Sequence, residues 1–232
     1  NKANKIIATS PNYVQGSKLL RKYKSKVEMV PLGFNHKRLP YSDPNRVNEI
    51  REQYKNKKII FSLGRQVYYK GFEYLIKSAK HLDDSYVILI GGKGELFDYH
   101  QNLVKSLGLS HKVKILGFLS DEDISSYYEA CSIFAMSSIK KSEAFGVVQL
   151  EAMSFGKPLV STSIVGSGVG WVNKHEHSGI VVPIKDDLAI AKAFISICNN
   201  KNDYGYKSKN RYNEKFKISI ITEKIVNIYL NL

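Results

Sequence analysis

Two glutamates before and within one predicted helix are the side chains whose spacing points most directly to chemistry. Glu143 and Glu151 stand eight positions apart, the first just before that helix and the second on its second turn. At the helix start, the backbone N–H groups of Gly146, Val147 and Val148 lack intrahelical acceptors and can bind an anion. Glu143 beside them can accept hydrogen bonds from hydroxyl groups, and Glu151 is expected to face the same cleft. Plainer interpretations are a carboxylate that complements the helix dipole and a solvated helix position.

A pair of cations follows the apolar run Lys58–Gly64. Arg65 and Lys70 stand five positions apart and are bracketed by Gly64 and Gly71. A guanidinium and an ammonium in one loop can hold an anion, above all a diphosphate. The same residues also fit two surface cations in a flexible loop.

Other motifs in the sequence indicate a functional site less strongly. The segment Gly91–Glu95 contains G-x-G, but Phe97 stands where a dinucleotide-binding fingerprint has its third glycine. Its glycines still permit close approach of a ligand to the backbone. His175 and His177 are two positions apart in a loop, which does not suit a helical zinc site. Neither a nucleophile elbow nor a Walker loop is present, and we expect no metal.

Apolar periodicity predicts alternating strands and helices. The predicted strands are Lys5–Thr9, Val27–Val30, Lys58–Gly64, Tyr86–Gly91, Val113–Leu116, Ile133–Met136, Pro158–Thr162 and Gly179–Val182. The predicted helices are Asn45–Tyr54, Phe72–Leu82, Leu96–Leu107, Asp121–Ala130, Phe145–Ser154, Asp187–Cys198 and Ile218–Tyr229, with an amphipathic stretch before Tyr23. This alternation predicts an α/β fold, a parallel sheet with helices on both faces. Ligands of such sheets bind beyond the carboxyl ends of the strands, where the candidate residues lie.

The composition is that of an ordinary globular protein. The 232 residues are 43% hydrophobic and 24% charged. No apolar run reaches the roughly 18 residues that span a bilayer. The first residues contain neither an initiator Met nor a signal-peptide core, so we expect a part of a longer protein. Cys131 and Cys198 are far apart, which excludes a disulfide scaffold and favours a reducing compartment.

The net charge of +14 is unevenly distributed. Residues 1–60 carry 14 basic and 4 acidic side chains, whereas residues 61–160 carry 11 of each. A solvated Lys-rich face and a surface that meets phosphates of lipids or of an anionic substrate both fit this pattern. Nucleic acid is not expected, because the Lys residues are scattered and no recognition motif is present.

Taken in order, the motifs resemble the C-terminal half of GT-B glycosyltransferases of the retaining, family 4 (group 1) kind. Gly64-Arg65 with Lys70-Gly71 is similar to the family's G-R-x(4)-K-G loop, and Gly92-Lys93-Gly94 to its second glycine loop. Leu116–Leu119 resembles its L-G-[FY]-[VL] strand end.

The glutamates add the most specific part of this resemblance. Glu143 and Glu151 fit the family's E-x(7)-E signature, which continues here through Ala152–Pro158. One segment departs from the family. Where it commonly has G-G-x-x-E, this sequence reads G-S-G-V-G-W-V-N over Gly166–Asn173, and this departure bears on the donor sugar.

The resemblance implies three parts. Residues 1–34 are expected to be the tail of an acceptor-binding domain and an interdomain linker. Residues 35–212 are expected to form a Rossmann-like nucleotide-sugar-binding domain, the C-terminal domain of a GT-B fold, and residues 213–232 a C-terminal crossover helix. The acceptor, lipid-linked or a glycan, is expected to bind mainly to an N-terminal domain outside this sequence.

The resemblance also implies an activity and roles for residues. It implies transfer of a sugar from a UDP-, GDP- or ADP-sugar, with retention and with neither a metal nor a further cofactor. Arg65, Lys70 and Glu143 are the expected catalytic residues: Arg65 and Lys70 are expected to neutralise the diphosphate and Glu143 to contact the transferred sugar. Glu151 is expected to contact the ribose. Phe118 and Leu119 border the base. The other expected substrate-binding positions are Gly64, Gly92, Gly94, Ala144, Phe145, Gly146, Val147 and Val148.

Bacterial relatives of this kind build lipopolysaccharide and other surface polysaccharides, so we expect such a pathway and a cytoplasmic enzyme. Peripheral contact with the anionic inner face of the cytoplasmic membrane stays open. Two alternatives stay open as well. One is a nucleotide-sugar-binding or epimerising GT-B-like protein, against which the E-x(7)-E block argues, and the other is a basic membrane adaptor without transfer activity.

Overall fold

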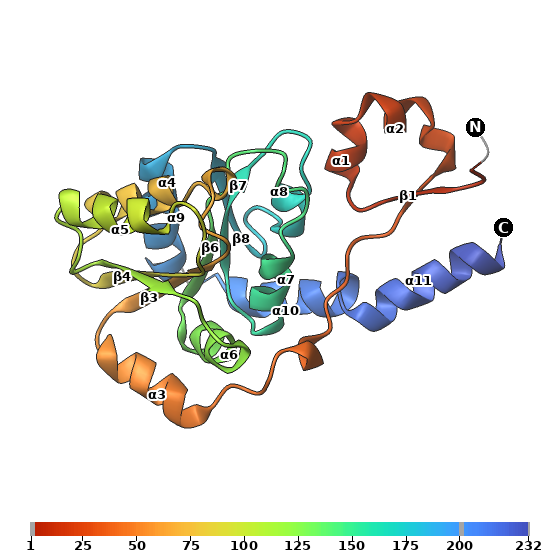
Figure 1. Cartoon of the computed structure of the whole chain (residues 1–232). Coiled ribbons are helices and arrows are strands. Elements are labelled where there is room, and N and C mark those ends of the chain that lie inside the picture. The colour runs from red at the N-terminus through yellow and green to blue at the C-terminus, as the bar shows by residue number, and fades with distance from the viewer. Residues whose placement is uncertain (1–2, 200–201, 232) are drawn as a thin grey trace.

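The computed structural model describes residues 3–199 and 202–231, and its centre is a six-stranded sheet (Figure 1). The strands are β3 (Lys58–Leu63), β4 (Tyr86–Gly91), β5 (Val113–Gly117), β6 (Ile133–Met136), β7 (Leu159–Ser163) and β8 (Gly179–Pro183). Their order is β5-β4-β3-β6-β7-β8, and every neighbouring pair is parallel. β4 and β6 are buried along their whole length, as expected for a sheet covered on both faces.

Helices cover both faces of this sheet (Figure 1). One face packs against α3 (Pro44–Gln53), α6 (Asp121–Ala130), α7 (Val147–Ser154), α8 (Val169–Val172) and α10 (Tyr204–Lys215). The other packs against α4 (Phe72–Ser78), α5 (Phe97–Ser106) and α9 (Asp187–Asn199). Alternate strand residues serve the two cores, since Phe61 and Phe134 point to the first face and Ile60 and Ile133 to the second.

A smaller unit precedes the sheet. β1 (Ile6–Ala8) and β2 (Val27–Met29) form a parallel pair joined through α1 (Pro11–Gln15), α2 (Lys18–Lys22) and the 3-10 turn η1 (Lys24–Lys26). This unit and the last helix, α11 (Ile218–Leu230), lie to one side of the sheet (Figure 1). Phe34 joins the two chain segments that lead to them, because its N–H donates to Phe216 and its carbonyl accepts from Ile218.

All eight predicted strands and all seven predicted helices are present, which confirms the predicted α/β fold, and only the ends of some differ. The predicted helix Phe145–Ser154 begins at Val147, because Gly146 adopts a left-handed conformation with φ of 76°. The predicted helix Phe72–Leu82 is α-helical to Ser78 and continues as the 3-10 turn η4 (Ala79–His81). The remaining short turns are η2 (His36–Arg38) and η3 (Tyr68–Lys70).

The sequence did not predict α8 and α10. The buried side chains of α10 are Tyr204, Ser208, Arg211 and Tyr212, so its inner face carries no aliphatic residue at helical spacing. None of the helices in the described part of the chain is long and apolar enough to cross a bilayer. The predicted division at residues 34 and 212 stays a prediction.

Candidate active site

The two central strands of the sheet, β3 and β6, are neighbours in space although two strands and three α-helices separate them in sequence. From β3 the chain winds outward to β4 and β5, and it then returns to β6 and winds the other way to β7 and β8. In open α/β sheets, the ligand crevice lies outside the carboxyl ends of the strands at such a point of reversal. The loops after β3 and β6 carry Lys70 and Glu143, so two predicted site residues lie at this point.

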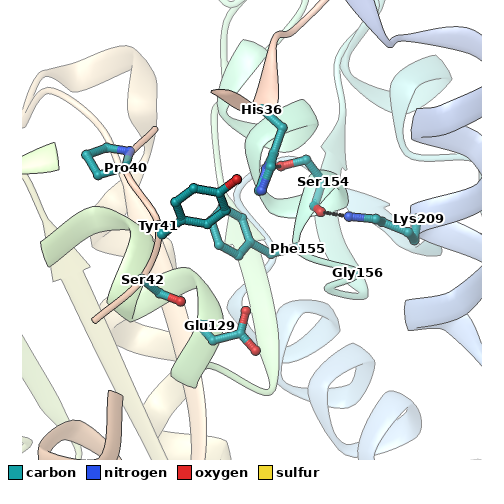
Figure 2. Close-up of a pocket in the computed structure, with 9 residues that line it drawn as sticks. All are labelled: His36, Pro40, Tyr41, Ser42, Glu129, Ser154, Phe155, Gly156 and Lys209. Carbon is teal, nitrogen blue, oxygen red and sulfur yellow. Dashed lines mark hydrogen bonds between the residues drawn. The ribbon is translucent and has the colours of Figure 1, made fainter. Parts of the chain in front are cut away.

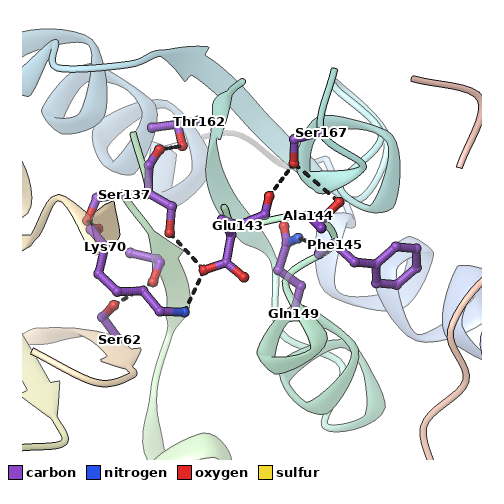
Figure 3. Close-up of polar contacts among 11 residues, drawn as sticks. Ser62, Lys70, Ser137, Glu143, Ala144, Phe145, Gln149, Thr162 and Ser167 are labelled. Atoms are coloured by element: carbon purple, nitrogen blue, oxygen red, sulfur yellow. Dashed lines mark hydrogen bonds and ion pairs between the residues drawn. The ribbon is translucent and has the colours of Figure 1, made fainter. Parts of the chain in front are cut away.

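Lys70 and Glu143 form an ion pair there (Figure 3). The distance from Lys70 Nζ to Glu143 Oε2 is 2.5 Å, and each side chain is 12% exposed. The hydroxyl of Ser138, which follows β6, donates to the same carboxylate oxygen at 3.1 Å. A phosphate contact and a sugar contact that were predicted separately therefore lie side by side. The sequence prediction missed Ser138, although two consecutive serines directly after a buried strand were a usable signal.

The segment after β7 makes hydrogen bonds to the loop that carries Glu143 (Figure 3). The hydroxyl of Ser167 donates to the carbonyl of Glu143, and the N–H of Gly168 donates to the carbonyl of Ala144 at 2.8 Å. Ser167 and Gly168 belong to the stretch that departs from the family pattern. That stretch therefore supports the loop that carries Glu143 through contacts with its backbone carbonyls.

The start of α7 faces the same point. Its N-cap, Gly146, makes no side-chain capping hydrogen bond, and the first N–H groups of any helix lack intrahelical acceptors. Val147 is exposed, and Val148 is partly so. Phe145 is buried against Trp171 and Phe216, so its side chain belongs to the core. At Phe145 only the backbone can serve a ligand.

Glu151, on the second turn of α7, is partly buried, which is not the solvated helix position of the plainer interpretation. Tyr128 donates its hydroxyl to Glu151 Oε2 at 2.9 Å. Burial raises the pKa of the Glu151 carboxyl, whereas the Tyr128 hydrogen bond and the cations Arg38 and Lys70 act in the opposite direction. Lys70 therefore acts on both glutamates, which supports a single site.

The glycines of the first two loops serve loop packing. A Cβ placed on Gly92, whose φ is 114°, lies 2.1 Å from the carbonyl oxygen of Gly64. A Cβ on Gly94 lies 2.5 Å from the carbonyl oxygen of Gln66, and one on Gly64 lies 3.2 Å from Lys70 Cε. Glycine is required here because the two loops touch through their backbones and Lys70 crosses Gly64.

A buried histidine braces these loops, and the sequence prediction missed it. His100 Nδ1 hydrogen-bonds to Gln66 Oε1, and Gln66 Nε2 donates to the carbonyl of Gly92 at 3.3 Å. Burial lowers the pKa of His100 to about 4, so the ring is neutral and donates one N–H to Gln66. No local signal marks this pair, because its members are brought together only by the fold.

Three predicted residues lie at the edge of the site. Arg65 is exposed, and within residues 3–199 and 202–231 it makes neither an ion pair nor a side-chain hydrogen bond. Phe118 is 75% exposed. Leu119 lies over Gly91 at the end of β4, since a Cβ on Gly91 lies 2.6 Å from its Cδ1. The interpretation of Arg65 as a surface cation stays open.

Two hollows lie apart from these residues. A pocket of about 350 Å³ is found at the far end of α7, where His36, Ser154 and Lys209 meet (Figure 2). Its lining contains none of the predicted site residues. A groove of about 800 Å³ runs along the ends of β7 and β8 and includes Lys141, from the same loop as Glu143.

Known structures define the class of this fold. The chain superposes on Anabaena Alr3699/HepE, solved in complex with UDP, with a TM-score of 0.84 and 22% identity, over 99% of this chain and 64% of that one. It also matches all of the C-terminal domain of the group 1 family protein LpcC from Francisella tularensis, over 80% of this chain, with a TM-score of 0.65 and 23% identity. The fold is that of the C-terminal half of a GT-B glycosyltransferase.

The sequence comparisons identify the family. The model of the family described as "Glycosyl transferases group 1" matches residues 45–217. The chain is 34% identical over 230 residues to O-antigen chain mannosyltransferase C of Escherichia coli, covering 98% of this chain and 60% of the relative. It is 30% identical over 216 residues to the D-rhamnosyltransferase WbpZ of Pseudomonas aeruginosa, covering 92% and 55%. The chain belongs to the group 1 glycosyltransferases, and it spans little more than half the length of these curated relatives.

Proposed function

We propose that this chain is the donor-binding half of a retaining glycosyltransferase that uses a nucleoside diphosphate sugar. The observation that carries the proposal is the meeting of Lys70 and Glu143 at the point of reversal between β3 and β6. The complex of Alr3699/HepE with UDP supports a nucleotide donor. The name of the Escherichia coli relative, an O-antigen chain mannosyltransferase, supports a role in O-antigen or other surface polysaccharide synthesis.

In this proposal the diphosphate lies between Lys70 and the N–H groups that begin α7, with Arg65 at its outer side. Transfer forms a bond between the acceptor oxygen and the anomeric carbon and breaks the bond from that carbon to the phosphate oxygen. Negative charge then develops on the phosphate. Cations and N–H groups already directed at that position stabilise this charge without reorganisation. The departing phosphate takes the proton of the acceptor hydroxyl, which keeps the attack on the face the phosphate leaves.

The two glutamates divide the recognition of the donor. One oxygen of Glu143 is engaged by Lys70 and Ser138, and its carboxylate also has a second oxygen to accept a hydroxyl of the transferred sugar. Glu151 accepts hydroxyls of the ribose. We place the protein in the cytoplasm, with the acceptor held mainly by the part of the longer protein outside these residues. Contact with an anionic membrane is tested separately, by measuring binding of the protein to anionic vesicles.

Calorimetric titration of the chain with UDP, GDP and ADP tests the proposal. One nucleoside diphosphate is expected to bind, and Lys70→Ala is expected to weaken it, whereas Lys77→Ala on the surface of α4 serves as the matched control. Binding to anionic vesicles with no response to any nucleotide would instead identify a membrane adaptor. Interconversion of nucleotide sugars without an acceptor would identify an epimerising enzyme.

A further inference from the structure

The hydroxyl of Tyr128 is a buried polar group for which the proposed reaction has no direct use. Tyr128 lies on α6 and is 0% exposed, and its hydroxyl is 2.9 Å from Glu151 Oε2 on the neighbouring helix α7. The carbonyl oxygen of Val148 lies farther away, at 3.3 Å. A hydroxyl carries one proton, and the nearer, charged oxygen is the better acceptor. The contact therefore joins the core of the protein to the carboxylate assigned to the ribose.

The ring of Tyr128 is fixed by three aromatic neighbours. It stacks on Phe155 at 5.4 Å and 18°, and it meets the ring of Phe61 edge-on at 5.3 Å and 82°. Phe134 lies against it at 5.5 Å. Rotation of the ring would disturb all three contacts, so the hydroxyl is a donor with a fixed position.

Tyr128 donates to a carboxylate whose charged form is disfavoured by burial. Burial and Asp121 raise the pKa of Glu151, and the Tyr128 hydrogen bond is the largest influence that lowers it, ahead of Arg38 and Lys70. Within the described residues, the hydrogen bond from Tyr128 is the one that the Glu151 side chain receives, and it ends on Oε2. Oε1 is then available to accept a hydroxyl from a ligand.

We infer that Tyr128 is a positioning residue for ribose recognition, because it fixes one oxygen of Glu151 and so directs the other to the ribose hydroxyls. The inference rests on the proposed function, in which Glu151 contacts the ribose. A side chain already held in its binding conformation loses less conformational freedom when the ligand binds. Tyr128 itself touches no substrate in this arrangement.

The test compares a ribonucleotide with its deoxy form. Tyr128→Phe removes the hydroxyl and keeps the ring, and Tyr127→Phe is the matched control. Tyr127 is the adjacent residue, 5% exposed and stacked on Phe61 at 5.3 Å, and within residues 3–199 and 202–231 its hydroxyl makes no hydrogen bond to Glu151. Affinities for UDP and 2′,3′-dideoxy-UDP, which lacks both ribose hydroxyls, or for the GDP or ADP pair if that base binds better, are measured by calorimetry. Tyr128→Phe is expected to weaken the ribonucleotide about three- to tenfold and to leave the deoxy form unchanged.

A pH profile gives a second readout. Loss of the hydroxyl moves the pKa of Glu151 further upward. As the pH falls, the Glu151 carboxylate becomes protonated and the preference for ribose is lost, and this loss should begin at a higher pH in Tyr128→Phe than in the unaltered chain. The groups that face Glu151 besides Tyr128, namely Asp121, Arg38 and Lys70, are the same in both proteins. A merely structural role of Tyr128 would lower the melting temperature without this displacement.

Glu151→Ala distinguishes a failure of the proposed function from a failure of the inference about Tyr128. If it keeps the preference for ribose, Glu151 does not contact the ribose and that part of the proposed function is wrong. If it abolishes the preference while Tyr128→Phe retains it, the inference about Tyr128 is wrong and the proposed function stands. Equal weakening of both nucleotides by Tyr128→Phe also overturns the inference.

Discussion

Lys70 and Glu143 form a 2.5 Å ion pair between the loops that follow β3 and β6, with both side chains largely buried. The pair connects the residue expected at the diphosphate with the residue expected at the sugar. Removal of one member of a buried pair leaves the other charge uncompensated, which costs stability as well as function. Variants at these positions therefore need a measurement of folding beside the measurement of binding.

Lys70→Ala is expected to weaken binding of the best nucleoside diphosphate by about 1.5–3 kcal/mol, the range for hydrogen bonds to charged groups. Arg65→Ala is expected to cost less and to depend more on salt, because Arg65 is exposed. Calorimetry at two salt concentrations checks both, with urea unfolding to confirm that each variant folds. An equal loss for the nucleoside without phosphates would show that Lys70→Ala acts through misfolding, and a larger loss for Arg65→Ala would reverse the assignment.

The two glutamates are expected to differ in what they affect. In the longer protein, Glu143→Gln should lower turnover about 10- to 100-fold, the equivalent of one hydrogen bond to a charged group, and should change nucleotide affinity little. Glu151→Ala should weaken the nucleotide itself. Turnover is measured with a nucleotide sugar and an acceptor, and binding with the free nucleotide. The opposite pattern would exchange the roles of the two residues.

The sheet and the positions of the main candidate residues could be predicted from the sequence. β4 and β6 are buried on both faces, so they appear as continuous apolar runs, and their carboxyl ends had to lie at one edge of a parallel sheet. The positions of Lys70 after β3, of Glu143 after β6 and of Glu151 on the helix that follows could be predicted in the same way, whereas their roles stay predictions. The positive φ of Gly146 could not be predicted, which is why the start of α7 was placed two residues early.

The supporting contacts could not be predicted, because they join residues far apart in the chain. Tyr128 meets Glu151 and His100 meets Gln66 only after the helices pack. α10 was missed for a related reason. Its buried Arg211 donates to the carbonyls of Val172 and Trp171, so that helix is held in part by polar contacts that leave no apolar period.

Gly92→Ala is expected to destabilise the protein more than Gly108→Ala. Both glycines have positive φ, 114° and 68°, so both substitutions introduce backbone strain of about 1–3 kcal/mol. A Cβ on Gly108 meets no atom within 4 Å, whereas one on Gly92 meets the carbonyl oxygen of Gly64. Urea unfolding of both variants checks the difference. Equal losses would show that contact between the two glycine loops contributes nothing to stability.

The buried His100 predicts a loss of stability in mild acid. Its pKa is lowered from 6.5 to about 4 in the folded protein, so between these pH values only the unfolded chain binds the proton. Stability therefore rises with pH across this window and is lost as pH falls through it, by up to about 3 kcal/mol. His100→Gln should flatten this part of the curve of unfolding free energy against pH. An unchanged slope between pH 6.5 and 4 would assign the acid sensitivity to other groups.

The chain by itself is expected to bind its nucleotide sugar and to transfer no sugar. The 45–217 match covers the sheet, whereas the β1–β2 pair has only two strands, too few for a core of its own. α11 leaves Val226, Tyr229 and Leu230 exposed. Catalysis needs the acceptor held against the donor in a closed cleft, so the remainder of the longer protein is needed for turnover.

The test incubates the chain with the nucleotide sugar that it binds best and with a lipid-phosphate acceptor, in parallel with the longer protein. Calorimetry on the same preparation shows that the chain is folded and binds the donor, so that inactivity is not misfolding. Product formed only by the longer protein is the expected result. Transfer by the chain at a rate near that of the longer protein would place the acceptor site within these 232 residues, and the division of the protein into a donor half and an acceptor half would then be wrong.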